Sequence, residues 1–328
     1  MTMTRAELEA AAAQAFDGLT LVPDAEQSWQ TIAEMGWLMM CVPEDRGGLG
    51  QGGEARAVIH HAMGRALVPG PTIAQMAVVD ALAAGVRTDE TDALLEAAVA
   101  GDVMTASMAL SLAEDVLIAV PDADRASHVL HMTSERIALV PLEGCEVVGR
   151  ETWDETRRLF DVRVPGSQGV TIAEGNAARE LAETVRANLL LALAADALGG
   201  AEAALAMSVE YLGTRRQFDR PLAMFQALKH RCADLRVAIS LADALLWQEA
   251  ASPDLSLARA GALNALACQV YKETAEEAIQ LHGGIGLTLE HPCHLFLKRA
   301  FLNCALGGDA DYWEECAGRE RLAEISAA

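Results

Sequence analysis

Two stretches in the second half of the chain decide the fold: YLGTRRQFDRPLAMFQ (residues 211–226) and QLHGGIGLTLEHP (residues 280–292). The second has adjacent glycines, Gly283 and Gly284, with helical patterns on each side. Glycines let backbone N–H groups approach a phosphate where a Cβ would collide. This pattern indicates a phosphate-binding loop, although a helix cap and turn would need glycine as well.

Composition limits the class of protein. The chain has 328 residues, of which 52% are hydrophobic and 22% charged, as in a folded globular protein. A formal net charge of -22 argues against nucleic acid as a partner, because phosphate contacts need an excess of basic surface. The seven cysteines form no C-x-x-C pair, which favours reduced thiols.

Targeting signals are not apparent in the sequence. Glu7 and Glu9 interrupt the alanine-rich start, so it does not match a signal peptide, and no apolar run reaches membrane-spanning length. We therefore expect a cytoplasmic protein with no membrane association.

The pattern of apolar and polar residues changes twice along the chain. Residues 1–100 predict an N-terminal helical domain, interrupted by the Pro- and Gly-rich loop at 41–53. Residues 101–174 predict a reduced middle β domain of short antiparallel strands. Residues 175–328 predict a C-terminal four-helix bundle. One of its helices shows apolar or small residues in alternating steps of three and four: Phe225, Leu228, Cys232, Leu235, Ile239, Ala242 and Leu246.

The two quoted stretches resemble the paired C-terminal signature of the acyl-CoA dehydrogenase family of flavoproteins. That signature reads Y-x-x-x-R-x-Q-F-x-x-P-x-x-x-F-Q, followed about fifty residues later by Q-x-x-G-G-x-G. Near the N-terminus, MGWLMMCVPEDRGGLGQGG (residues 35–53) is similar to the P-E-x-x-G-G-L-G loop of the same family. The resemblance implies a mostly α, acyl-CoA dehydrogenase-like fold.

The resemblance also implies a set of FAD contacts. In the family, the C-terminal signature of one subunit reaches the FAD of its neighbour, with the arginine at the pyrophosphate. Arg215 offers a planar fork that matches phosphate oxygens. The residues that the resemblance assigns to the ADP half of FAD are Arg215, Phe218, Gln226, Gln280, Gly283 and Gly284. Nearby basic residues would supply a local positive patch on this acidic chain: Arg216, Arg220, Lys229, His230 and Arg231.

The catalytic base of the family has no counterpart. Acyl-CoA dehydrogenation needs a carboxylate whose pKa is tuned to remove the α-proton. In most relatives this glutamate lies about twenty residues after the glycine motif, where the present chain has Gly307. Some relatives carry it on the first long bundle helix, at a position equivalent here to Leu189. The nearest carboxylates are Glu183 and Asp309, so we expect no catalytic residue in this chain.

The middle section departs from the family as well. The T-E-P-x-A-G-S-D and W-I-T segments, which hold the flavin ring in relatives, have no counterpart between 101 and 173. These departures predict a non-catalytic subunit of a heteromeric FAD-dependent acyl-CoA dehydrogenase, with a homologous partner that supplies the glutamate. The pattern resembles the α2β2 heterotetramers of actinobacterial steroid side-chain degradation, which introduce an α,β double bond into a bulky acyl-CoA. The family commonly passes electrons to an electron-transfer flavoprotein.

Two alternatives remain open at this point. The chain could be a self-sufficient homomeric flavoenzyme that uses Glu183 or Asp309, or one that needs no α-base, as in a flavin oxygenase. It could also be a structural partner without a cofactor. We expect no metal at HPCH (residues 291–294), because His291 and His294 flank a proline with no further ligand nearby.

Overall fold

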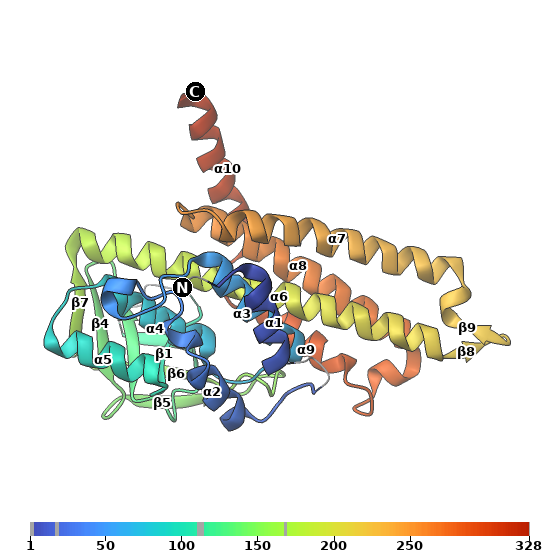
Figure 1. The fold of residues 1–328 in the computed structure, drawn as a ribbon, viewed down its shortest axis with the longest axis horizontal. Coiled ribbons are helices and arrows are strands. Elements are labelled where there is room, and N and C mark those ends of the chain that lie inside the picture. Colours follow the sequence, from blue (N-terminus) through green and yellow to red (C-terminus); the bar gives the residue numbers. More distant parts are fainter. Residues whose placement is uncertain (1–2, 17–19, 110–114, 167–168, 328) are drawn as a thin grey trace.

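The computed structural model describes residues 3–16, 20–109, 115–166 and 169–327. Helices make up both ends of the chain, and a small β section lies between them (Figure 1). This arrangement confirms the predicted mostly α fold class.

Among the N-terminal helices, α4 packs against α5 and also against α6 and β1, and it is buried along almost its whole length because most of its residues are apolar. The loop at 41–53 folds back on itself, and a Cβ on Gly48 would lie 2.1 Å from the carbonyl oxygen of Val42, so only glycine fits. The helices are α1 (Arg5–Ala15), α2 (Ala25–Glu34), α3 (Gly53–Ala66), α4 (Thr72–Ala84) and α5 (Asp89–Ala100).

The β section forms two sheets. The first has the order β1-β3-β4-β7 and the second the order β2-β6-β5. The prediction of purely antiparallel strands is wrong for one pair, since β1 and β3 are parallel. The chain leaves the first sheet through β2 in the second sheet before it returns, which provides the crossover that a parallel pair needs. The strands are β1 (Met104–Ala106), β2 (Val116–Pro121), β3 (His128–Met132), β4 (Arg136–Pro141), β5 (Glu146–Arg150), β6 (Leu159–Arg163) and β7 (Val170–Glu174).

The C-terminal helices surround α6, a helix of 40 residues. Among the described helices, only α6 is long and apolar enough to cross a membrane, but 83% of its most apolar window is buried in the fold. It crosses α3 closely, because a Cβ on Gly64 or Gly199 would lie 2.0 Å from a carbonyl oxygen of the opposite helix. The helices are α6 (Gly175–Thr214), α7 (Gln226–Ala250), α8 (Leu257–His282), α9 (Cys293–Ala305) and α10 (Ala310–Ala327), and most of α10 projects from the body (Figure 1).

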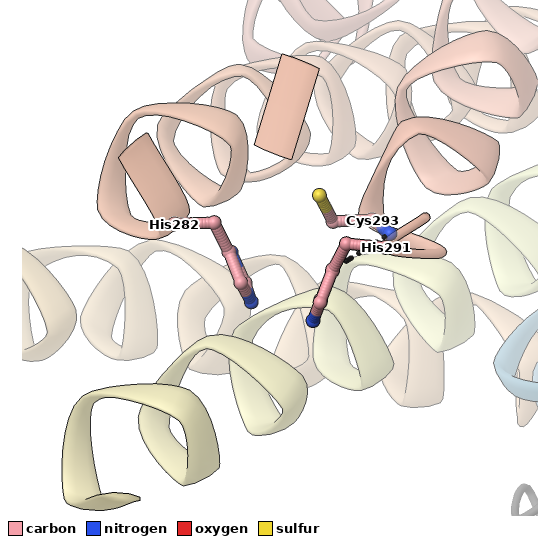
Figure 2. Close-up of side chains that lie close together, drawn as sticks. All are labelled: His282, His291 and Cys293. Atoms are coloured by element: carbon pink, nitrogen blue, oxygen red, sulfur yellow. Dashed lines mark hydrogen bonds between the residues drawn. The ribbon is translucent and has the colours of Figure 1, made fainter. Parts of the chain in front are cut away.

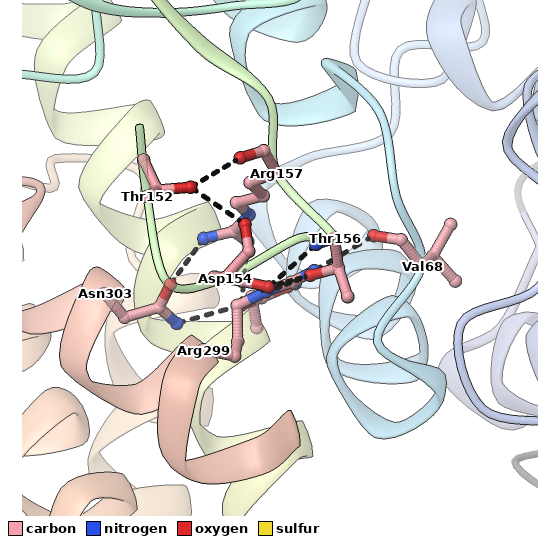
Figure 3. Close-up of polar contacts among 8 residues, drawn as sticks. Val68, Thr152, Asp154, Thr156, Arg157, Arg299 and Asn303 are labelled. Atoms are coloured by element: carbon pink, nitrogen blue, oxygen red, sulfur yellow. Dashed lines mark hydrogen bonds and ion pairs between the residues drawn. The ribbon is translucent and has the colours of Figure 1, made fainter. Parts of the chain in front are cut away.

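A buried network of charged groups joins the β section to the bundle (Figure 3). Arg299 of α9 is fully buried and contacts Asp154 at 2.7 Å and Asp196 of α6 at 3.3 Å. Arg157 contacts Asp196 at 2.9 Å, and Asn303 donates to the same carboxylate at 2.9 Å. Burial raises the pKa of Asp196, but Arg157 and Arg299 outweigh it and hold that pKa below its usual value. The network therefore stays charged at neutral pH.

The network predicts that loss of a buried ion pair lowers the free energy of unfolding much more than loss of an exposed one. Arg299→Met leaves Asp154 and Asp196 with one buried cation between them, and we expect it to lower the free energy of unfolding by about 3–5 kcal/mol. Arg319→Met removes only an exposed pair with Glu315 and should cost less than about 1 kcal/mol. Urea unfolding followed by circular dichroism measures both, and equal losses would contradict this role.

Candidate functional site

The first signature stretch forms a hairpin at the far end of the bundle (Figure 1). Its strands are β8 (Arg216–Gln217) and β9 (Arg220–Pro221), joined by Phe218 and Asp219. Both turn residues are left-handed, with φ of 52° and 62°, as in a tight two-residue hairpin. A left-handed conformation costs a non-glycine residue about 1–2 kcal/mol. The Phe218 side chain is nevertheless 82% exposed, so packing within this chain does not repay the strain.

Arg215 and Gln226 flank the hairpin and its short 3-10 turn. Arg215 follows the last residue of α6, and its carbonyl oxygen accepts a hydrogen bond from the Leu222 N–H at 2.8 Å. Gln226 begins α7. Both side chains are exposed, and neither makes a hydrogen bond or ion pair with any described residue. The two polar groups are therefore available to a ligand or a partner chain.

The second stretch begins where α8 ends. A 3-10 helix, η4, runs over Gly283–Leu287. A Cβ on Gly283 or Gly284 would meet nothing within 4 Å, whereas one on Gly286 would lie 2.7 Å from the Ile279 carbonyl oxygen. The fold thus requires glycine at 286 for packing but leaves open space beside Gly283 and Gly284, as a group that approaches from outside the chain would need.

The two stretches lie at the same end of the bundle. Tyr211, near the end of α6, has its ring 4.6 Å from that of His282 and 5.9 Å from that of His291. Gln280 is exposed and lines a groove between α7 and α8 that contains four carboxylates and Arg231, which pairs with one of them, Glu277. Large apolar side chains are exposed on the same elements: Phe218, Met224, Val237, Leu241, Leu287 and Leu289.

The position of the family's base is closed. Gly307 is buried with φ +80°, and a Cβ there would lie 2.7 Å from Nδ2 of Asn264 and 3.0 Å from Cδ2 of Leu190. Its N–H donates to the Met108 carbonyl oxygen at 3.1 Å, and its own carbonyl oxygen accepts from Nε1 of Trp313 at 2.7 Å. The chain's own groups occupy the space into which a side chain at 307 would point.

The other candidate positions for a base are no better placed. Leu189 is apolar and only 1% exposed. Glu183 is exposed on α6. Asp309 is exposed too, and its carboxylate accepts the Tyr312 N–H at 3.0 Å at the start of α10. Asp309 thus acts as a helix cap.

The surroundings of Gly307 are packed with apolar side chains from three parts of the chain. Met108, Leu190, Leu306 and Trp313 belong to one buried apolar cluster. A cavity next to this cluster, lined by residues that include Met108, Arg157 and Asp196, has a volume of about 20 Å³. Pockets that hold small molecules or cofactors measure about 300–1,000 Å³. This cavity is therefore too small for a flavin ring, whereas the exposed Arg215 side chain and the open space beside Gly283 and Gly284 fit the ADP half of FAD.

Sequence comparisons assign both ends of the chain to one class of protein. Residues 2–102 match the model of the acyl-CoA dehydrogenase N-terminal domain, and residues 187–319 match that of the C-terminal domain. The chain is 34% identical to acyl-CoA dehydrogenase IpdE2 of Mycobacterium tuberculosis (strain ATCC 25618 / H37Rv) over 276 residues, which cover 84% of this chain and 80% of that protein.

Solved structures share the fold. The chain matches a chain of the "Tcur3481-Tcur3483 steroid ACAD G363A variant" with a TM-score of 0.85 at 24% identity, over 99% of each chain. It matches a chain of the ChsE4-ChsE5 complex from Mycobacterium tuberculosis with a TM-score of 0.81 at 24% identity, over 98% of each chain. The two matched domains are those of a family of FAD-dependent oxidoreductases. The chain belongs to the acyl-CoA dehydrogenase family.

Sequence reasoning found Gly307 but missed the residues that close its surroundings. Trp313 packs against Gly261 of α8, where a Cβ would lie 2.2 Å from the indole ring. Met108 reaches Gly307 from the β section. A buried tryptophan needs a hydrogen-bond acceptor for its N–H. Trp313, which follows Gly307 and Gly308 closely, was therefore the one sequence signal that this position is enclosed.

Restoring the missing side chain should not restore chemistry. We expect Gly307→Glu to lower stability by about 1–3 kcal/mol, because the new Cβ overpacks against Asn264 and Leu190. It should give the chain no dehydrogenase activity of its own. Gly318→Glu is the control, since that helical position has open space. Thermal unfolding and turnover of an acyl-CoA with added FAD check both, and a stable, active Gly307→Glu variant would show that a site is present.

Proposed function

We propose that this chain is the non-catalytic subunit of a heteromeric FAD-dependent acyl-CoA dehydrogenase. A homologous partner supplies the catalytic glutamate and holds the flavin ring. One contrast within the chain carries the proposal. Neighbouring groups fill the space beside Gly307, the position predicted for the base, whereas the residues of the cofactor signature are exposed at the end of the bundle that carries β8 and β9.

The chain's own role is to bind and orient the ADP half of FAD. Arg215 pairs with the pyrophosphate, and the backbone at Gly283 and Gly284 approaches the cofactor without a Cβ in the way. Phe218 packs on the cofactor, and Gln226 and Gln280 offer hydrogen bonds. The bound FAD supplies the acceptor for the substrate's β-hydride, within the partner's half of the site.

The partner covers the exposed apolar surface. Phe218, Val237, Leu241, Leu287 and Leu289 are each more than half exposed on the elements that carry the cofactor signature. Grouped exposure of large apolar side chains marks an interaction surface in a soluble protein. Filling this surface with a homologous chain also brings Arg215 to the partner's cofactor.

Two structures with this fold support a heteromer and a substrate class. One is described as a complex of ChsE4 with ChsE5, and the other as a variant of the Tcur3481-Tcur3483 steroid ACAD. We infer an α2β2 heterotetramer in the cytoplasm that introduces an α,β double bond into a bulky acyl-CoA, with a steroid side-chain thioester as the leading candidate. Electrons leave through an electron-transfer flavoprotein.

Loss of a single phosphate contact tests the cofactor role. In the co-expressed complex, Arg215→Ala removes a charge-assisted hydrogen bond worth about 1.5–3 kcal/mol, so FAD should bind roughly 10- to 100-fold more weakly. The control is Arg163→Ala, an exposed arginine on β6. Titration of the flavin-stripped complex with FAD gives both affinities. Unchanged binding in Arg215→Ala would favour a structural partner without a cofactor role.

Expression with and without the partner tests the division of labour. The chain produced alone should be flavin-free and inactive, and FAD should be retained only on co-expression with a full-length homologue. A yellow, active homo-oligomer of this chain would contradict the proposal. In that event Glu183→Gln and Asp309→Gln would identify the base by loss of turnover, whereas we expect neither substitution to lower the turnover of the complex.

A further inference from the structure

Three metal-ligating side chains meet where α8 gives way to α9 (Figure 2). They are His282 at the end of α8, His291 in the loop, and Cys293 at the start of α9. One ligand atom from each lies within 4.8 Å of the others. The sequence-based expectation that His291 has no further ligand nearby is therefore wrong, because the loop returns it to His282.

His282 has the hydrogen bonding of a metal ligand. Its side chain is 3% exposed, and its Nδ1–H donates to the Ala278 carbonyl oxygen at 2.6 Å. The lone pair is therefore on Nε2, which is buried and has no hydrogen-bond partner among the described residues. Metal-bound histidines commonly donate their other ring N–H to a backbone carbonyl in this way.

His291 and Cys293 are held close to it. The two imidazole rings lie side by side with centroids 4.1 Å apart, and the buried Cys293 thiol lies at the Cβ end of the rings and points away from their tips (Figure 2). Nδ1 of His291 accepts only a long hydrogen bond, 3.3 Å, from the Cys293 N–H.

We propose that His282, His291 and Cys293 bind a Zn²⁺ ion, with its fourth position taken by water or by a group from a partner chain. Two imidazoles and a thiolate suit this borderline-soft cation. Ligands at 2.0–2.3 Å from zinc lie about 3.3–3.8 Å from one another in a tetrahedron, so ion binding requires the side chains to move closer and the Cys293 thiol to turn toward the two rings. Cys293 releases its thiol proton to solvent as the Zn–S bond forms.

The ion ties the last residue of α8 to the first turn of α9. Residues 283–292 lie between these two points and carry Gly283 and Gly284. The metal therefore fixes the loop that the proposed function places against the cofactor, although zinc binding itself does not depend on that function.

Zinc binding is measured on the full chain in its purified complex, stripped with chelator and re-equilibrated with ZnCl₂. Competition with a chromophoric chelator should show one specific site per chain. X-ray absorption at the zinc edge should show one sulfur at about 2.3 Å and two imidazole nitrogens at about 2.0–2.1 Å. These two measurements use the unaltered protein, so they do not depend on whether a variant folds.

Cys293→Ser and His282→Asn should each weaken zinc binding at least tenfold. Cys304→Ser and His294→Asn should leave it unchanged, because these are an exposed cysteine and a neighbouring histidine outside the set of three. Failure of the unaltered complex to bind stoichiometric zinc, a zinc shell without sulfur, or equal affinity in folded Cys293→Ser would overturn the proposal.

Discussion

The buried ion network around Arg299 is the constraint on which the rest of the structure depends. It links α9, α6 and the segment before β6, and it holds two arginines and two aspartates away from water. Removing such groups from water costs several kcal/mol per ion, so the network is stable only when every partner is present. It locks the β section onto the bundle.

Under the proposed function, two roles that a homomeric dehydrogenase would combine are divided between this chain and its partner. Around Gly307, contacts from Met108, Leu190 and Trp313 leave no room for a catalytic carboxylate. At the end of the bundle the opposite holds, since Arg215 lacks a partner within the described chain and Phe218 sits in a strained, exposed turn. Strain that local packing does not relieve points to a contact made outside the chain.

The sequence predicted what rests on local pattern. The paired signatures, the order of helices and strands, and the glycine at 307 could all be read from spacing. The parallel pairing of β1 with β3 could not, because it depends on a crossover through a second sheet. The buried ion network could not be predicted either. Arg299 contacts Asp196 and Asp154, which lie 103 and 145 residues earlier in the chain, and it follows a lysine in a helix whose sequence suggests one exposed face. The sequence did not indicate that His282 lies beside His291, because the loop between them folds back in a way that its glycines do not specify.

The most direct test of the central claim is the structure of the flavin-loaded complex with its homologous partner. The account predicts FAD at the interface, with its pyrophosphate within hydrogen-bond distance of Arg215 of this chain and its ring against the partner's glutamate. A flavin ring lying beside Gly307 of this chain, or an FAD that makes no contact with Arg215, would contradict it.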